Sequence, residues 1–286
     1  MEHRLILSDG IDEIDFYDDP DIMLTNSDGW DSTADVSVSE YGGGDGGHIT
    51  NCRMSVRYIN IYGKFRKSGS VMRGKRRLNS ICRHDKIVRL DIKSPLDVYR
   101  IYGVVGKTTI DLHSYPMTFA IPIICADPYF YSADVTELQL MGTDGLFEFL
   151  PEGTVLNDII YGDSEGTGVY TAENSGDISV GFDFTATFNI RCENPVLYNA
   201  TTGRHIRINT VFDSGDVLEI CTRDNHKTVF ITNGSGRVNG LKYMSADSDM
   251  FQLAAGENIV KFDIPGTDGG AAEAYMRFVP RCEAVT

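Results

Sequence analysis

The chain has 286 residues, of which 42% are hydrophobic and 23% are charged, and it carries a net charge of −15 at pH 7. This length suffices for one or two domains with large cores, and the composition excludes disordered and collagen-like proteins. The strong acidity excludes a general nucleic-acid-binding protein, because phosphate contacts require a basic face.

The charge is distributed unevenly along the first half of the chain. Residues 1–45 contain 13 acidic side chains and a single base, Arg4, whereas the segment from Lys64 to Lys86 contains nine Lys and Arg and a single acid, Asp85. The basic segment is solvated, paired within the chain, or paired with another molecule. If it has a partner, contact between acidic and basic patches on copies of the same chain fits the asymmetry best.

The first clear strand is predicted just after Cys52, within the sequence RMSVRYINIYG. Polar and apolar residues alternate there with a period of two, and the phase slips at Ile59, which predicts a bulge or a strand end buried on both faces. The preceding glycines formally match a dinucleotide-binding pattern, but a strand follows them instead of a helix. A flexible loop is therefore predicted for Gly42 to Gly47.

One helix is predicted in this half, around residues 71–83. Gly74 weakens it by up to ~1 kcal/mol. Four apolar residues could share one face of this helix, namely Val71, Leu78, Ile81 and Cys82. The basic residues would then lie on the exposed face, and they include Arg73, Lys75, Arg76, Arg77 and Arg83.

Short β-rich sequences follow the helix, and the last of them, MTFAIPIIC, ends at Asp127-Pro128. Proline lacks the N–H that a strand donates and restricts the residue before it, so the strand ends there. We expect this strand to be the last of an N-terminal domain, with the next aromatic residues packed at the domain seam. The predicted domains are residues 1–134 and 135–286, and the predicted seam consists of Asp127, Pro128, Tyr129 and Phe130.

Residues 178–190, ISVGFDFTATFNI, give the strongest periodic signal in the chain. Apolar side chains occupy alternate positions from Ile178 to Ile190, which predicts one long antiparallel strand with a buried face and a hydrated face. More short strands follow, separated by turn sequences such as Asp213 to Asp216. This half is predicted to be a β-sandwich of jelly-roll or Greek-key type.

No residue pattern predicts catalysis, a metal site or a cofactor. The six cysteines form no C-x-x-C pair and resemble small buried hydrophobic residues, and the six histidines lack the spacing of metal ligands. The sequence from Gly103 to Thr108 lacks the first glycine of a phosphate loop, and the acidic sequence near Asp28 lacks the register of a calcium loop. We therefore expect no catalytic residues, no metal ligands and no cofactor.

The N-terminal sequence MEHRLILSDG has only a three-residue apolar run. Elsewhere, no segment approaches the ~20 apolar residues that span a bilayer. We expect no signal peptide, no membrane partner and synthesis in a reducing cytoplasm.

Four passages together resemble the distal tail proteins (Dit) of long-tailed bacteriophages, a siphovirus-type tail component family. The region from Asn194 to Phe262 is the most specific, because Thr202-Gly203, Ser214-Gly215-Asp216 and Gly256-x-Asn258 follow the order of the family. The likeness covers nearly the whole chain. The other three passages are GGGDGGHITNCRMSVRYINIYGKF, the basic helix RGKRRLNSICRHDKIVRLDI and the seam FAIPIICADPYFYS.

The resemblance implies a mainly β fold, with an N-terminal β-sandwich-like domain that carries one helix and a C-terminal galectin-like jelly-roll sandwich. It also implies a structural hub in the virion tail tip or baseplate, made in the host bacterial cytoplasm, whose N-terminal domains close a homohexameric ring. The implied partners are further copies of the chain, the tail tube protein, the tail-associated tip protein, and receptor-binding or baseplate proteins. The acidic first 45 residues and the loop around YGDSEGTGVYTAENSG depart from the family.

The basic helix is the predicted interface of this hub. Its residues Arg73, Lys75, Arg76 and Arg77 are expected to meet carboxylates of a neighbouring subunit or of the tube protein. Charge reversal at all four positions is then expected to block assembly while leaving the fold intact.

The alternative function is a glycan-binding module that recognises a host cell wall through the C-terminal sandwich. Trp30, the single tryptophan, lies outside that sandwich. Aromatic side chains can serve as stacking surfaces for a sugar, but a core or seam position is the better expectation for most tyrosines here. The tyrosines in question are Tyr170, Tyr198, Tyr243 and Tyr275.

Overall fold

The computed structural model describes residues 4–66, 71–95, 97–111, 113–142, 169–267 and 270–285. The chain divides into two compact units: unit 1 consists of residues 1–134 and 281–286, and unit 2 consists of residues 135–280. The chain thus returns to unit 1 after completing unit 2, whereas the predicted division assigned residues 281–286 to the second domain. The return occurs because β11 (Phe130–Ser132) pairs with β24 (Arg281–Cys282).

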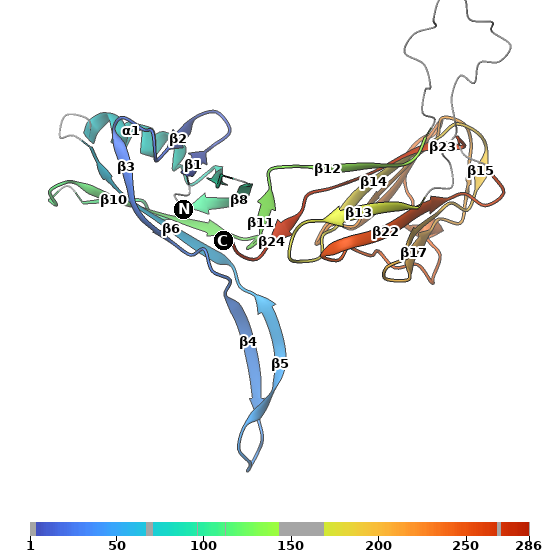
Figure 1. Cartoon of the computed structure of the whole chain (residues 1–286), viewed down its shortest axis with the longest axis horizontal. Helices are drawn as coiled ribbons and strands as arrows, with labels where there is room; N and C mark the ends of the chain where they lie inside the picture. The colour runs from blue at the N-terminus through green and yellow to red at the C-terminus, as the bar shows by residue number, and fades with distance from the viewer. Residues whose placement is uncertain are drawn as a thin grey trace, which may run out of the picture. The chain divides into compact units, whose positions relative to one another are not determined.

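Unit 1 is built on one antiparallel sheet (Figure 1). Its strands follow the order β2-β1-β7-β8-β10-β6-β3, β9 pairs with β10, and β11 joins β24 to β8. Apolar side chains from the whole sheet contribute to a single core cluster. The strands are β1 (Arg4–Ser8), β2 (Glu13–Asp15), β3 (Ile22–Asp28), β6 (Arg57–Phe65), β7 (Ile87–Lys93), β8 (Val98–Val105), β9 (Thr109–Asp111), β10 (Thr118–Cys125), β11 and β24.

The predicted helix is confirmed as α1 (Val71–Ile81), which ends slightly before the predicted position. It buries Val71, Leu78 and Ile81 in the core of unit 1. A Cβ atom at Gly74 would lie 2.9 Å from the Phe65 ring and 3.2 Å from the Ile22 side chain. Glycine therefore allows the helix to approach the sheet closely, and this packing explains a residue that lowers helix propensity.

Of the two outcomes predicted near Ile59, a bulge or a strand end buried on both faces, the structure shows a strand end, but it lies earlier, at Met54, and it is not buried. β5 (Gly47–Met54) ends before Ser55, and β6 begins at Arg57. β5 pairs with β4 (Ala34–Glu40) in a separate two-stranded sheet, whereas β6 lies between β10 and β3 in the main sheet of unit 1. The altered phase of the alternation therefore marks the start of a new strand, and the predicted glycine loop is the turn of the β4–β5 hairpin.

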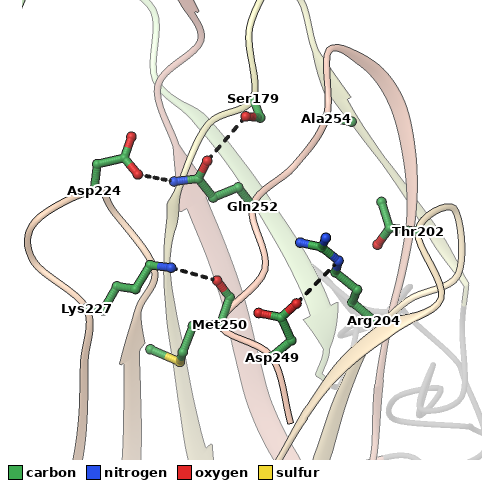
Figure 2. A pocket seen from close by; sticks show the side chains of 9 residues that line it. All are labelled: Ser179, Thr202, Arg204, Asp224, Lys227, Asp249, Met250, Gln252 and Ala254. Atoms are coloured by element: carbon green, nitrogen blue, oxygen red, sulfur yellow. Dashed lines mark hydrogen bonds and ion pairs between the residues drawn. The ribbon is translucent and has the colours of Figure 1, made fainter. Parts of the chain in front are cut away.

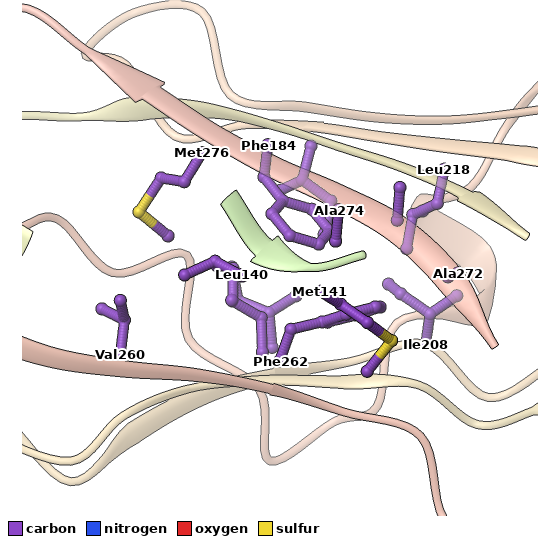
Figure 3. Packing of buried hydrophobic residues seen from close by; sticks show 14 of the residues in the cluster. Leu140, Met141, Phe184, Ile208, Leu218, Val260, Phe262, Ala272, Ala274 and Met276 are labelled. Carbon is purple, nitrogen blue, oxygen red and sulfur yellow. The ribbon is translucent and has the colours of Figure 1, made fainter. Parts of the chain in front are cut away.

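Unit 2 contains two larger antiparallel sheets whose apolar side chains share one core, partly shown in Figure 3. Residues such as Phe184 and Met276 come from the six-stranded sheet and Phe262 from the four-stranded one. In order, the six strands are β12 (Thr136–Met141), β23 (Ala272–Phe278), β14 (Phe182–Phe188), β19 (Val217–Cys221), β20 (Thr228–Asn233) and β21 (Gly236–Asn239). The four-stranded sheet has the order β13 (Tyr170–Asn174), β22 (Gly256–Asp263), β16 (Val196–Asn199) and β17 (Arg204–Arg207).

Two short strands and one short helix complete the regular elements described in unit 2. β15 (Cys192–Glu193) pairs with β18 (Val211–Phe212), and η3 (Leu241–Tyr243) is a single 3-10 turn after β21. Strands thus dominate both units, and α1 is the α-helix within the residues described, as the sequence predicts.

β14 covers only the centre of the strand predicted at residues 178–190. The alternation is correct there, because Phe182, Phe184 and Phe188 are all buried. Before β14, the chain continues the pattern through an isolated bridge between Val180 and Leu253. At the other end, Ile190 is 49% exposed, so the buried face ends at Phe188.

Buried amide side chains hold the loops at the edge of the four-stranded sheet. Asn258 is fully buried, accepts a hydrogen bond from the Ala254 N–H (2.9 Å), and donates to the carbonyls of Ala254 (2.8 Å) and Gly256 (3.0 Å). Asn174 donates to the carbonyl of Ile178 (2.8 Å). Buried neutral amides therefore supply hydrogen-bond partners to the backbone of these loops.

Candidate assembly surfaces

The basic helix α1 is paired with the acidic segment of its own chain. Arg73 Nε lies 2.6 Å from Asp21 Oδ2, and Arg77 forms an ion pair with Asp19. Both carboxylate side chains are only 2% exposed, and the hydrogen bond from Arg73 lowers the pKa of Asp21 below its usual value. Of the three alternatives that the sequence leaves open, pairing within the chain applies to these two arginines.

The other two predicted interface residues differ from Arg73 and Arg77. Arg76 is exposed and Lys75 is partly exposed, and neither forms an ion pair with another residue that the structure describes. Charge reversal at all four positions would therefore place acids beside the buried Asp19 and Asp21. We therefore expect reversal at Arg73 and Arg77 to destabilise unit 1 as well as to affect assembly, whereas a retained fold stays the prediction for Lys75 and Arg76.

The β4–β5 hairpin is a ribbon with one apolar face and one polar face, extending away from the rest of unit 1 (Figure 1). Every residue of β4 is exposed, and Val38 and Ile49 on the apolar face are 57% and 67% exposed. On the polar face, Arg53 pairs with Asp35 at 3.0 Å. The directly opposed pairs of the apolar face are Ala34 with Met54, Val36 with Cys52, and Val38 with Ile49.

This hairpin has the properties of a docking element. A two-stranded ribbon is only marginally stable by itself, and a contiguous exposed apolar face usually marks an interaction site. Nothing else within the residues described covers the apolar face of β4. We therefore expect the hairpin to be ordered by contact with a partner.

A second apolar surface crosses four strands of unit 1, and we call it the apolar ladder. Ile87 on β7 lies opposite Val104 on β8, Val104 lies opposite Ile124 on β10, and Ile124 lies opposite Tyr58 on β6. Their exposed fractions range from 39% at Val104 to 68% at Ile87. Residues that alternate with them, such as Ile59 and Ile123, face the core, so the ladder lies on the outer face of the sheet.

The predicted seam residues lie in unit 1, around β11. β10 ends at Cys125 before the Asp-Pro sequence, as predicted, but β11 and β24 follow it, so β10 is not the last strand of unit 1. Phe130 is fully buried, whereas Tyr129 is partly exposed with the Arg281 guanidinium 4.7 Å from its ring centre. Asp127 accepts a hydrogen bond from the Tyr131 hydroxyl (2.5 Å).

Arg57 is the central polar residue of this region, and the sequence analysis did not single it out. It is only 5% exposed, and its guanidinium carbon lies 4.6 Å from the centre of the Phe130 ring. Burial lowers its pKa. Its donors bind five backbone carbonyls, those of Gly29 (3.0 Å), Trp30 (2.8 Å), Asp31 (2.9 Å), Pro128 (2.6 Å) and Glu283.

Arg57 therefore joins three segments that are far apart in the sequence. One side chain thus donates hydrogen bonds to backbone carbonyls in three places: the segment before the hairpin, the loop before β11, and the C-terminal end. The sequence offered one signal for this role, since Arg57 occupies a position that faces the core in the alternation of β6.

Unit 2 has a polar pocket of about 420 Å³, lined by loops of the sandwich (Figure 2). Its side chains bond mainly to one another: Gln252 Nε2 donates to Asp224 (2.6 Å), and Arg204 lies 3.3 Å from Asp249. Lys227 donates to the Met250 carbonyl (3.3 Å). Internal pairing of this kind leaves the pocket without a convergent set of free polar groups.

No reactive centre is evident within the residues described. No group of three or more His, Cys, Asp or Glu side chains there is placed to hold a metal ion, and no helix there is long and apolar enough to cross a membrane. The six cysteines are free. Burial raises the pKa of Cys82 to about 11 and that of Cys125 to about 12, so both remain protonated thiols at neutral pH.

A protein-family model described as siphovirus-type tail component, C-terminal domain, matches residues 175–281. This region belongs to the siphovirus-type tail component family. A tail component is a structural part of a virion, so the match confirms both the resemblance and the non-enzymatic class that the sequence predicts. No curated protein sequence matches the chain.

Solved structures are similar to the whole chain in fold. The crystal structure of phage SPP1 Dit, described as a paradigm of the hub adsorption apparatus in phages that infect Gram-positive bacteria, matches with a TM-score of 0.66 and 14% identity. That match covers 98% of this chain and 99% of the other. A chain of the phage P2 baseplate, in its activated conformation with Ca, matches with a TM-score of 0.51 and 11% identity over 100% of both chains. The fold is therefore Dit-like.

Proposed function

We propose that this tail component is the structural hub of a siphovirus tail tip or baseplate, and that unit 1 closes a homohexameric ring. The observation that carries the proposal is that the amphipathic β4–β5 hairpin occurs in the same unit as the apolar ladder. Both surfaces are apolar and exposed in the single chain. They have different shapes, since one is a protruding ribbon and the other a sheet face.

Contact between such unlike surfaces is heterologous, because the hairpin of one copy docks on the ladder of the next. A heterologous contact closes into a ring when the rotation between copies permits it. The apolar pairs of the hairpin, such as Val38 with Ile49, would pack on Tyr58 and Ile124 and bury both surfaces. The six-fold number of copies comes from the resemblance to distal tail proteins.

The remaining faces of the ring would serve the other partners. The tail tube protein would bind one face and the tail-associated tip protein the opposite face. The galectin-like sandwich of unit 2 would hold receptor-binding or baseplate proteins. Lys75 and Arg76 are the basic residues of α1 that remain available for acidic groups of such neighbours.

Complementation of a phage that lacks this gene product tests the proposal directly. Val38→Asp combined with Ile49→Asp places two charges on the apolar face of the hairpin, and we expect loss of assembled tails while the isolated chain keeps its fold. Ser39→Asp, on the polar face of the same strand, is the matched control and should give normal tails. Normal tails from the double variant, counted by electron microscopy, would contradict the proposed ring contact.

A further inference from the structure

A row of side chains crosses the outer face of the six-stranded sheet of unit 2. Each member lies directly opposite the next on the neighbouring strand, and neighbouring strands are about 4.8 Å apart, so the spacing is regular. We call this row the outer rung. In order from β12 to β21, it consists of Gln139, Tyr275, Thr185, Glu219, Phe230 and Asn239.

The outer rung is accessible and combines aromatic rings with hydrogen-bonding groups. Tyr275 is 37% exposed, Phe230 is partly exposed, and the amides at both ends and Thr185 are exposed. Two aromatic rings are therefore separated by a hydroxyl and a carboxylate. Aromatic faces contact apolar C–H surfaces, while the groups between them donate and accept hydrogen bonds.

Arg237 completes a polar centre beside Phe230. Its guanidinium carbon lies 4.0 Å from the centre of the Phe230 ring, and its Nη2 atom lies 3.0 Å from Glu219 Oε2. The stacking and the ion pair together hold the N–H donors of the Arg237 guanidinium next to the Glu219 carboxylate, which accepts hydrogen bonds. Adjacent hydroxyl groups of a sugar can accept from the guanidinium and donate to the carboxylate at the same time.

The charge on this face argues against a polyanionic ligand. Although the whole chain has a net charge of −15, Glu219 is paired with Arg237, and Asp183 on the same face is paired with Arg223 at 3.2 Å. The face also lacks the apolar centre of a protein interface, since Tyr275 and Phe230 are its only aromatic members along the rung. A neutral, hydroxyl-rich and elongated ligand matches it best.

We propose that the outer rung binds a neutral linear glycan that lies across the strands, with Tyr275 stacked on one sugar ring and the Arg237–Glu219 pair bonded to hydroxyl groups. This site assigns the glycan-binding alternative to one face of unit 2. It goes beyond the hub and does not depend on it, because binding to the rung needs only the single chain.

The test uses the full-length chain on an array of neutral oligosaccharides comprising glucans, galactans, rhamnans and N-acetylhexosamine oligomers, with poly(glycerol phosphate) as the polyanionic arm. Calorimetry then measures Kd for the best neutral probe. We expect Tyr275→Ala and Arg237→Ala each to weaken binding by about tenfold or more. Tyr275→Phe keeps the ring and should bind nearly as well as the wild type.

Tyr198→Ala is the matched control, because Tyr198 is a partly exposed aromatic on β16 of the other sheet. It should leave Kd unchanged. Three results would overturn the site: no neutral probe bound at millimolar concentration, binding of poly(glycerol phosphate) alone, or a Kd that Tyr275→Ala and Arg237→Ala leave unchanged while circular dichroism shows folded variants. Tail assembly by Tyr275→Ala, measured separately, reports on the hub and not on the rung.

Discussion

The two units satisfy their buried polar groups in different ways. Unit 1 buries charged side chains, including Arg57, Asp19 and Asp21, whereas unit 2 buries neutral groups, including Asn174 and Asn258. In unit 1 these three charges join segments that are distant in the sequence, as Arg57 does for Pro128 and Glu283. In unit 2 most of the amide bonds connect loops close to the amide itself.

This difference predicts which conditions should destabilise each unit. Unit 1 depends on charge and on the C-terminal end of the chain, so its stability should respond to pH and to truncation. The buried polar side chains of unit 2, such as Asn174 and Asn258, do not titrate, so its stability should be less sensitive to pH than that of unit 1. The two units can be separated experimentally if the full-length chain unfolds in two steps.

Arg57→Ala should have the largest effect. Five carbonyls would lose their donor, including that of Glu283, and the loss of a buried charged partner costs roughly 3–5 kcal/mol. Urea unfolding of the full-length chain should show the unit 1 transition at much lower urea and the unit 2 transition unchanged. A parallel shift of both transitions would show that the units are not independent.

Asn258→Ala should have the next largest effect, and it should act on unit 2. The substitution removes the side-chain partner of the Ala254 N–H and of the Gly256 carbonyl, and it leaves the Ala254 carbonyl with its second donor, Asn174 (3.1 Å), at a total cost of roughly 2–3 kcal/mol. Asn209→Ala, at an exposed position of unit 2, is the control and should change the unfolding midpoint very little. If both variants behaved alike, the buried amide would have no special structural role.

Acidification should destabilise unit 1 before unit 2. Hydrogen bonds from Lys86 and Arg73 hold the pKa values of Asp9 and Asp21 below the ordinary value of 3.8. A depressed folded-state pKa contributes stability above the unfolded value, and that stability is lost as pH falls from about 4 through the folded values. Urea midpoints measured between pH 7 and pH 2 should fall more steeply for unit 1. Equal slopes for the two units would contradict the assignment.

The smallest effect on stability is expected for Lys75→Glu combined with Arg76→Glu. These side chains have no ion pair within the residues described, so the free energy of unfolding should stay within about 0.5 kcal/mol of the wild type. Arg73→Glu is the contrasting variant, because it places an acid beside Asp21 and should lower the stability of unit 1. Thermal unfolding of the two variants distinguishes them. Equal stability of both would show that the Arg73–Asp21 pair makes no measurable contribution to the free energy of unfolding.

Much of the fold could be predicted because it depends on local periodicity. The alternation around Phe184 identified a buried strand face, and the helical spacing of Val71, Leu78 and Ile81 identified α1. The Asp-Pro sequence correctly marked the end of β10. The break between β5 and β6 was predicted too late, near Ile59, and was not distinguished from a bulge, because two successive strands of opposite phase resemble one bulged strand in a sequence.

The candidate surfaces were less predictable because they depend on strand neighbours. The ladder and the outer rung each combine residues from at least four strands, and no local pattern connects Ile87 with Tyr58 or Gln139 with Asn239. The basic helix was visible in the sequence, but its partners Asp19 and Asp21 were not identifiable.

The sequence by itself determined the β-rich class, the position of α1, the inward residues of the main strands and the likeness to a tail component family, because these follow from side-chain periodicity and motif order along the chain. Only the tertiary structure decided which charges are paired internally, which apolar residues remain exposed, and that the C-terminal end belongs to unit 1. Those properties depend on strand register and on contacts between distant segments, such as Arg57 with Glu283, which a linear pattern does not specify.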